Sequence, residues 1–297
     1  MLENLTRQTV VPLEVVLVDG APEGEDDTQT VVQSILPTLN YRLVYVRRGG
    51  GTAIQRNIGI DRAQGAYIAF IDDDVRLNPD YFERMLEVYE KDTERRIGGM
   101  AGYITNQFLD PEKSPRWRWY RRVRLFTTYE PGRYDFQSGY PINRYLHPPH
   151  DGVREIDFMG SNCALWRREV IDSGLRFDEF FRDYGTLEDA HFALRAKRKW
   201  TLVENGRACC QHLHAPGGRQ NARRISYKTA VNYRFVFMDI VPERTWVQEW
   251  RFWRVQVFDL FRMLAFAVRS RAGKDWQGVL GKATGIAAAW RMKPKGA

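Results

Sequence analysis

Short apolar runs alternate with amphipathic segments along the first hundred residues of the chain. Four runs rich in β-branched and aromatic residues predict strands, at 13–19, 42–46, 66–71 and 97–104. The segments between them have helical spacing and follow polar or glycine-rich turns. Strands that alternate with helices in this way predict an α/β fold, with a mostly parallel sheet and flanking helices.

This rhythm changes at two places. Residues 106–157 are rich in Pro, Arg, Trp and Tyr and lack a regular pattern, and a long irregular stretch in a compact domain is often functional. Beyond Pro216-Gly217-Gly218 the apolar positions follow helical spacing. We therefore expect an α/β domain over 1–215, with an irregular insertion at 106–157, and a helical region over 216–297.

The composition indicates a sizeable hydrophobic core and an anionic partner. The chain is 43% hydrophobic and 28% charged, as in globular proteins with a sizeable core, and no apolar run approaches the roughly 18 residues of a membrane span. The net charge of +8 favours an anionic partner: nucleic acid, anionic lipid or a phosphorylated substrate. Cys163, Cys209 and Cys210 lack disulfide or metal-site spacing, so we expect buried, reduced thiols and a cytosolic location.

The most informative motif is Asp72-Asp73-Asp74, directly after the third strand. Carboxylates this close repel one another, and the repulsion is offset where a divalent cation or another positive ligand lies among them. The motif also lies at the carboxyl end of a strand, where open α/β sheets bind ligands. A solvated turn rich in Asp is the alternative.

Two further positions fit a ligand site at the same edge of the sheet. Asp19 ends the first strand, where its carboxylate is placed to accept a hydrogen bond from a nucleobase N–H; a turn-forming Asp is the alternative. The run Gly49-Gly50-Gly51 leads into Arg56-Asn57, which brings backbone close to a ligand with a cation nearby. Both positions favour a phosphorylated nucleotide ligand.

The stretches 51–60 and 63–74 are similar to the central block of the family 2 glycosyltransferases of the GT-A fold. The resemblance covers about residues 1–215 and implies an enzyme that takes a sugar from a nucleotide-sugar donor. The family usually begins with a strand that carries a Pro-Thr-x-Asn-like run, whereas this sequence opens in the helix that follows, at residues 2–9. We therefore expect the usual first strand to be missing.

In such enzymes an Asp-x-Asp pair, here Asp72 and Asp74, holds Mg²⁺ or Mn²⁺ against the pyrophosphate of the donor. A hard cation with oxygen ligands offsets the charge that builds on the leaving diphosphate. The resemblance also implies that Asp73 faces the ribose or the sugar. It assigns the further nucleotide-sugar contacts to Asp19, Gly51, Arg56, Asn57 and Arg219.

The pair Glu188-Asp189 resembles the family's Glu-Asp pair, in which the Asp deprotonates the acceptor hydroxyl. An inverting transfer needs such a base opposite the leaving group. Residues 186–189 also fit a helix capping box, in which Asp189 only reaches back to the Thr186 amide. The presence of Asp72 and Asp74 favours the interpretation of Asp189 as a general base over its interpretation as part of a helix cap.

His212 and His214 are the candidates for a nitrogen ligand to the metal, because enzymes that resemble this chain often use a histidine at this place. We favour His214, since it adjoins the loop 215–219, which is suited to close over the diphosphate with Arg219 pairing to it. A structural role for both histidines is the alternative.

Arginines are interleaved with aromatic residues at 116–124 and along 250–269. The first segment fits an acceptor-binding or membrane-facing flap, or a solvated helix face. No recognisable nucleic-acid module surrounds it, so no nucleic-acid partner is expected. The second segment forms an apolar stripe flanked by Arg, which suits either an anionic membrane surface or a packed core.

These patterns together predict an inverting, metal-dependent glycosyltransferase. It would act on a polysaccharide or lipid-linked acceptor, in the cytoplasm or at the inner face of the cell membrane. The alternative is a catalytically inactive relative that binds a nucleotide, a sugar or a membrane. A nucleotidyltransferase would need an N-terminal Gly-rich phosphate loop, which the sequence does not show.

Overall fold

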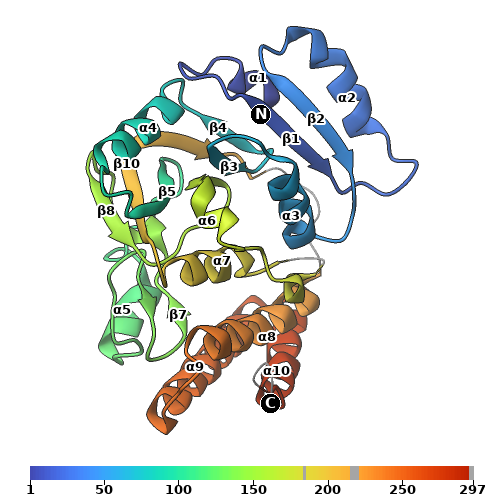
Figure 1. Cartoon of the computed structure of the whole chain (residues 1–297). Helices are drawn as coiled ribbons and strands as arrows, with labels where there is room; N and C mark the ends of the chain where they lie inside the picture. The colour runs from blue at the N-terminus through green and yellow to red at the C-terminus, as the bar shows by residue number, and fades with distance from the viewer. Residues whose placement is uncertain (183–184, 215–220, 294–297) are drawn as a thin grey trace. The chain divides into compact units, whose positions relative to one another are not determined.

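The computed structural model describes residues 1–182, 185–214 and 221–293 of the chain. The chain divides into two compact units. The first comprises residues 1–109 and 147–215, and the second comprises residues 110–146 and 216–297 (Figure 1). The polypeptide therefore leaves the first unit after residue 109 and re-enters it at His147.

A six-stranded mixed sheet forms the centre of the first unit. It contains β3 (Tyr67–Ile71), β9 (Cys163–Arg167), β5 (Ile97–Ile104), β10 (Thr201–His212) and β4 (Val75–Leu77) in that order, and β8 (Val153–Ile156), which also pairs with β10. Strands β3, β5 and β10 run in one direction, and β9, β4 and β8 run in the other. The expected α/β class is confirmed, with a sheet of mixed direction.

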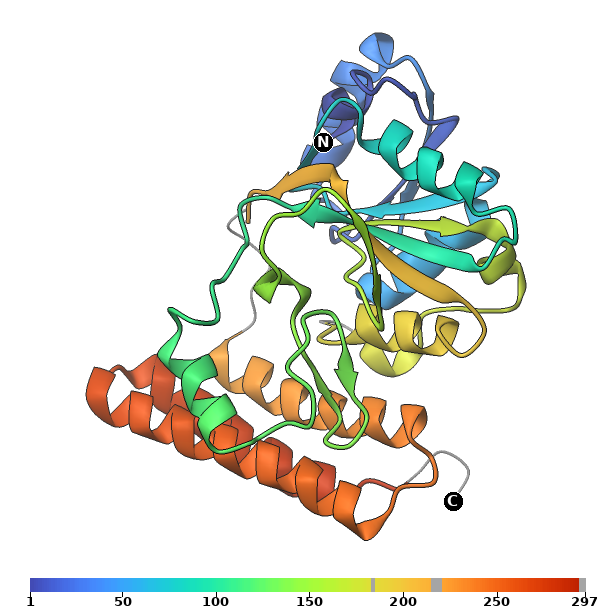
Figure 2. The same cartoon turned by 90° about the vertical axis from the view of Figure 1, so that its left-hand side faces the viewer.

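Helices cover both faces of this sheet. The first unit contains α1 (Leu2–Leu5), α2 (Asp27–Ile35), α3 (Thr52–Arg62), α4 (Tyr81–Lys91), α6 (Arg168–Asp172) and α7 (Glu188–Ala196), with 3₁₀ turns at Leu36–Thr38 and Glu179–Phe181. Helix α4 lies on one face and α7 on the other (Figure 2). The Tyr89 hydroxyl of α4 donates to the Leu165 carbonyl of β9 over 2.7 Å, and Phe192 of α7 packs edge-on against Trp166 with ring centroids 5.0 Å apart. Both layers are thus fixed to the strand beside β3.

Two further strands form a separate parallel sheet. β1 (Glu14–Asp19) pairs with β2 (Arg42–Arg47) over their whole length, with Asp19 opposite Arg47 at the end. Helix α3 packs against β1 (Figure 1). Within the described part of the chain, β2 is the one strand that pairs with β1, and β9 is the one strand that pairs with β3.

The acidic triplet lies in a turn between two strands. Residues 72–74 connect β3 to the short strand β4, and α4 begins only at Tyr81. The apolar pattern did not reveal β4 because it has three residues, and its pairing with the end of β10 is a contact over more than 130 positions. Residues 201–212 form one strand, β10, with an irregularity between Asn205 and Cys209.

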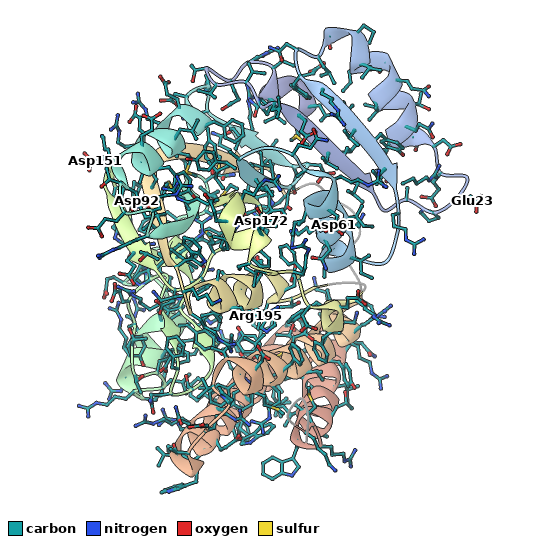
Figure 3. All side chains as sticks on the ribbon, in the orientation of Figure 1. Glu23, Asp61, Asp92, Asp151, Asp172 and Arg195 are labelled. Carbon is teal, nitrogen blue, oxygen red and sulfur yellow. The ribbon has the colours of Figure 1, made fainter. Side chains whose placement is uncertain are left out.

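A buried ion pair supports the first unit next to α4. Arg167 ends β9, and its Nη2 lies 3.0 Å from Oδ2 of Asp92, with side chains 2% and 9% exposed. Asp92 is labelled in Figure 3. Burial alone would raise the pKa of Asp92, but the amides of Ile97 and Arg96 and the Arg167 guanidinium lower it below its usual value. The guanidinium also lies over the Tyr89 ring, 4.6 Å from its centroid.

The second unit is mainly helical. It contains α5 (Pro115–Arg122), β6 (Tyr134–Asp135), β7 (Tyr140–Pro141), a 3₁₀ turn at Arg144–Leu146, α8 (Ala222–Ile240), α9 (Trp246–Ser270) and α10 (Gly273–Trp290). Trp117 and Tyr120 of α5 share a hydrophobic cluster with Phe126, Ile142 and Val255 of α9. Helix α10 approaches α8 closely, because a Cβ at Gly281 would overlap the α8 backbone.

The apolar stripe expected along 250–269 is largely exposed. Trp250, Phe261 and Val268 are 55%, 64% and 55% exposed, whereas α9 buries Phe252 and Val255 on another side. The segment at 116–124 is divided in the same way, since its Trp117 and Tyr120 are buried. None of the helices in the described ranges is long and apolar enough to cross a membrane.

Candidate active site

The acidic turn is held by β3 and β4. The Val75 amide donates to the Asp72 carbonyl over 3.2 Å, which closes the turn. The side chains of Asp72 and Asp74 are 39% and 17% exposed, and Asp73 is exposed. Two of the three carboxylates are therefore drawn toward neighbouring groups of the protein, while Asp73 faces solvent.

His212 completes a cluster with these acids. Its position in β10 is opposite Val75 of β4, so its ring comes next to the turn. The ligand atoms of Asp72, Asp74 and His212 all lie within 4.8 Å of one another. The structure thus brings His212, rather than the favoured His214, into the group that fits a metal ion.

His214 lies beyond the end of β10, in the left-handed region with a φ of +53°. Its ring centroid is 4.2 Å from that of His212, and its Nε2 lies 2.8 Å from Nε2 of Gln107. His214 is therefore a neighbour of the cluster through His212 and Gln107. Arg219, which we expected to pair with the diphosphate, lies outside the described residues.

Gln107 is a polar contact of the cluster that the sequence did not suggest. Its Nε2 lies 2.9 Å from Nδ1 of His212, and its Oε1 is buried with no hydrogen-bond partner in the described parts of the chain. Because the two ends of an amide are interchangeable by a flip, Oε1 can instead accept from Nδ1–H of His212. That arrangement leaves the Nε2 lone pair of His212 for a metal, which is the usual role of such a partner.

The donor set therefore fits a divalent cation. Two carboxylates supply the oxygen ligands that Mg²⁺ and Mn²⁺ prefer, and an imidazole is a common additional ligand for Mn²⁺. With its amide flipped, Gln107 supplies the acceptor that a metal-ligating His212 needs at Nδ1.

Arg56 links the acidic turn to α7. Its Nη2 lies 3.3 Å from Oδ1 of Asp72, and its Nη1 lies 3.0 Å from Oε1 of Glu188. The guanidinium is also over the Phe177 ring, 5.4 Å from the centroid. Burial works to lower the pKa of Arg56, but the surrounding carboxylates outweigh it and raise the pKa. Arg56 is therefore a charged hub between elements that are distant in sequence.

The carboxyl group of Asp189 is partly buried and has a raised pKa. Burial and the charge of Glu188 raise the pKa of Asp189 to about 7, against the partial opposition of Arg56. Its Oδ1 accepts from the Ala190 amide over 2.7 Å. Gly160 leaves room beside the other oxygen, because a Cβ there would come within 3.2 Å of Oδ2. A carboxyl with a pKa near neutrality is suited to proton transfer.

The start of α7 differs from a capping box. The residue before the helix is Leu187, not Thr186, which makes Asp189 the second helical residue rather than the third. Leu187 has a φ of +73°, in the left-handed region that costs a residue with a Cβ about 1–2 kcal/mol. Strain of this kind is concentrated at functional sites, and here it directly precedes Glu188 and Asp189.

A cavity of about 720 Å³ lies between β1 and β3. Polar residues from several elements line it, including Asp19, Thr52, Gln55, Arg56, Asp72 and Asp73. Four of the expected nucleotide-sugar contacts therefore share one hollow. Its volume is in the usual range for small-molecule sites.

Asp19 is positioned by its own turn and by β2. Its Oδ1 accepts from the Ala21 amide over 2.9 Å, and its Oδ2 accepts from the Tyr45 hydroxyl over 2.7 Å. Donation of this hydrogen bond to Asp19 raises the pKa of Tyr45. The turn-forming role suggested as an alternative is thus present, and Asp19 lines the cavity as well.

Gly51 and Asn57 shape the start of α3. Gly51 precedes the helix with a φ of +93°, a conformation that glycine adopts without strain. Asn57 donates to the Phe177 carbonyl over 2.9 Å and accepts from the Phe177 amide over 2.8 Å. Both ends of this side chain are used by the backbone, so Asn57 holds the segment beneath Arg56.

The family model described as Glycosyl transferase family 2 matches residues 1–172 of the chain. The chain belongs to glycosyl transferase family 2. The resemblance seen at residues 51–74 is thereby confirmed.

Relatives within the family cover parts of the chain. It is 27% identical over 154 residues to the uncharacterized glycosyltransferase YwdF of Bacillus subtilis (strain 168), which is 50% of this chain and 53% of YwdF. It is 37% identical over 86 residues to the succinoglycan biosynthesis protein ExoO of Rhizobium meliloti (strain 1021), which is 29% of this chain and 24% of ExoO. The chain thus spans about half the length of YwdF and less of ExoO.

A solved structure supports the same fold. The crystal structure of GalNAc-T7 with UDP, GalNAc and Mn²⁺ matches with a TM-score of 0.52 and 14% identity, over 78% of this chain and 45% of that one. At this identity the match concerns the fold alone. It agrees with the α/β glycosyltransferase architecture of the first unit.

Proposed function

We propose that this family 2 chain is an inverting, metal-dependent glycosyltransferase that moves a sugar from a nucleotide-sugar donor to a hydroxyl group of its acceptor. The observation that carries the proposal is Asp189. It is a partly buried carboxyl with a pKa raised to about 7, and Arg56 links its helix to Asp72 of the acidic turn. These contacts support a proton acceptor at Asp189 close to a diphosphate site at the acidic turn.

The donor would lie in the cavity between β1 and β3. Asp19 is suited to the base, and Asp73 to the ribose or the sugar. Asp72, Asp74 and His212 would hold Mg²⁺ or Mn²⁺, which when bound offsets the negative charge of the departing diphosphate. His214 would support His212 from the side, and Gln107 would orient its ring.

Asp189 would act as the general base. Its carboxylate takes the proton from the acceptor hydroxyl as that oxygen forms a bond to the anomeric carbon of the donor sugar. The bond from that carbon to the diphosphate oxygen breaks, so a single displacement inverts the configuration. Glu188 raises the pKa of Asp189 and anchors Arg56, which makes it a positioning residue.

The acceptor would be a polysaccharide or a lipid-linked glycan. The relative ExoO, named for succinoglycan biosynthesis, supports a role in making a cell-envelope polysaccharide. The UDP of the GalNAc-T7 structure makes UDP-sugars the first donors to test.

The second unit would bring the enzyme to the inner face of an anionic membrane. Large aromatic side chains are exposed on α9 and α10, with Trp246 at 79%, Phe261 at 64% and Trp290 at 68%. Arginines accompany them along α9. Aromatic rings with flanking cations are the chemistry that binds anionic lipid surfaces.

A transfer assay tests the proposal. The full chain is incubated with UDP-, GDP- and dTDP-sugars and Mn²⁺, and both donor hydrolysis and the anomeric configuration of any product are measured by NMR. Asp189→Asn should lower turnover by about 100-fold or more, the usual contribution of a general base. The matched control is Asp172→Asn, an exposed acid at the end of α6 (Figure 3).

Full turnover in Asp189→Asn would remove this residue from its role, and retained configuration would contradict single displacement. Nucleotide binding by calorimetry, without turnover of any donor, would instead favour the inactive binding relative.

A further inference from the structure

We propose that His147, His150 and Glu204 form a second metal site, suited to zinc or a similar transition-metal ion and separate from the acidic turn. Their ligand atoms lie within 4.8 Å of one another. Two imidazoles and one carboxylate are a ligand set that Zn²⁺ uses, typically with water in the fourth position. None of the three residues belongs to the cluster of Asp72, Asp74 and His212.

The tautomer of His147 is set by its neighbour. Nδ1 of His147 lies 2.7 Å from the carbonyl oxygen of Pro148. Because a carbonyl oxygen can only accept, Nδ1 carries the proton and the lone pair is on Nε2. Metal-ligating histidines usually donate their other N–H to a carbonyl or carboxylate in this way.

His150 and Glu204 have a spacing that suits a shared ion. Nε2 of His150 lies 3.2 Å from Oε1 of Glu204. Two ligands at zinc distances in a tetrahedral arrangement are about 3.3 Å apart. The Glu204 side chain is 1% exposed, and Arg154 supplies positive charge to this deeply buried carboxylate.

Strands β10 and β5 hold the ligands in place. Gly206 of β10 admits the segment 147–150, because a Cβ there would collide with the His150 carbonyl oxygen and lie 2.6 Å from its Nδ1. Tyr103 of β5 donates to the His147 carbonyl over 3.2 Å and packs its ring edge-on against His150. The ring of His150 is therefore turned with Nε2 toward Glu204.

Arg154 of β8 shares the Glu204 carboxylate. Its Nη2 lies 2.7 Å from Oε1, and the two residues are opposite each other in the β8–β10 pairing. A carboxylate has about four lone-pair positions, so an arginine and a metal can share it. The guanidinium nevertheless repels a cation, so the ion should bind only moderately to the natural chain and more tightly to Arg154→Met.

The proposed site lies where the chain returns to the first unit. His147 is the first residue of the first unit after the excursion through residues 110–146. An ion held by His147, His150 and Glu204 would join this point of re-entry to β10. We infer a structural clip, since ligands from a loop and a strand restrict the loop when they share an ion.

Zinc titration of the chelator-treated full chain tests the proposal. The Asp74→Asn background weakens the acidic-turn cluster, and Zn²⁺ binding is followed by calorimetry and Co²⁺ binding by visible absorption. We expect one ion per chain, bound about 10-fold or more weakly after His147→Gln or His150→Ala and about 10-fold more tightly after Arg154→Met, in line with the effect of ligand-shell changes. His214→Ala is the matched control and should leave this affinity unchanged.

Binding that is absent from the Asp74→Asn chain, or that His147→Gln and His150→Ala leave intact, would overturn the proposal. Modification of the unsubstituted chain by diethyl pyrocarbonate keeps the test independent of folding defects in the variants. Zn²⁺ should protect both His147 and His150 from modification, and equal rates with and without Zn²⁺ would also overturn it.

Discussion

Nε2 of His212 lies 2.9 Å from Oδ1 of Asp74, which connects the end of β10 to the acidic turn after β3. More than 130 positions separate the two residues in the sequence. A metal ion between them would use one ligand from each, so its affinity should depend on both.

His212→Ala should therefore raise the Mn²⁺ concentration needed for half-maximal donor hydrolysis by about 10-fold to 100-fold. His214→Ala should have a smaller effect, because this residue adjoins the cluster only through His212 and Gln107. Donor hydrolysis measured against Mn²⁺ concentration for both variants shows which substitution has the larger effect. A larger effect of His214→Ala would assign the ligand to that histidine.

Gln107→Ala should weaken Mn²⁺ binding about 10-fold, as the loss of a partner that orients a ligating histidine usually does. The side chain touches both histidines but is not expected to touch the donor. Activity at saturating Mn²⁺ should therefore stay near that of the natural chain. A loss that excess Mn²⁺ does not restore would show another role for Gln107.

The pH dependence should report the Asp189 carboxyl. Since a base acts in its deprotonated form, kcat/KM should rise with pH up to about 7 and then level off, following the raised pKa of Asp189. Glu188→Gln removes a charge that raises this pKa, so the rising limb should move to lower pH. If the rising limb of the pH profile does not move in Glu188→Gln, the electrostatic role of Glu188 is contradicted.

Asp189→Asn should stabilise the protein at alkaline pH while it removes activity. The pKa of Asp189 rises from 3.8 to about 7 on folding, so folding favours the protonated form. Its stability contribution is full below about pH 4 and is lost as the pH rises through about 7. Denaturant unfolding at pH 8 should show a gain for Asp189→Asn of up to about 4 kcal/mol, and a smaller gain at pH 5.

Asp92→Asn should cost about 3–5 kcal/mol at neutral pH, because it leaves the buried Arg167 guanidinium without its carboxylate. The pKa of Asp92 is lowered by folding, so its contribution is present above the unfolded pKa of about 4 and is lost as the pH falls through the folded pKa. Urea unfolding at pH 7 and pH 3 measures both effects. Asp61→Asn, at an exposed pair with Arg176, is the control (Figure 3).

The sequence predicted best what depends on local pattern. The apolar runs located β1, β2, β3 and β5, and the block at 51–74 revealed the family. The acids at 72 and 74 were identified because carboxylates at a strand end are a local signal. Their roles in binding remain predictions.

Features that depend on distant pairing were harder to foresee. Residues two apart on a strand point to the same side, so the pattern gave no means to separate His212 from His214; the left-handed φ of His214 does so. Gln107 lies in the irregular stretch and meets His212 only because β5 and β10 are neighbours. Its place just after the strand at 97–104 was the one available signal.

The cavity between β1 and β3 has a mechanical consequence. A two-stranded sheet has little stability of its own, and β1 has no hydrogen-bonded strand on its cavity side among the described residues. A donor that touches Asp19 on one wall and Asp72 on the other would act as a brace across this gap. Binding of the donor would then make the N-terminal hundred residues more rigid. Amide hydrogen exchange in β1 and β2 would become slower as a result.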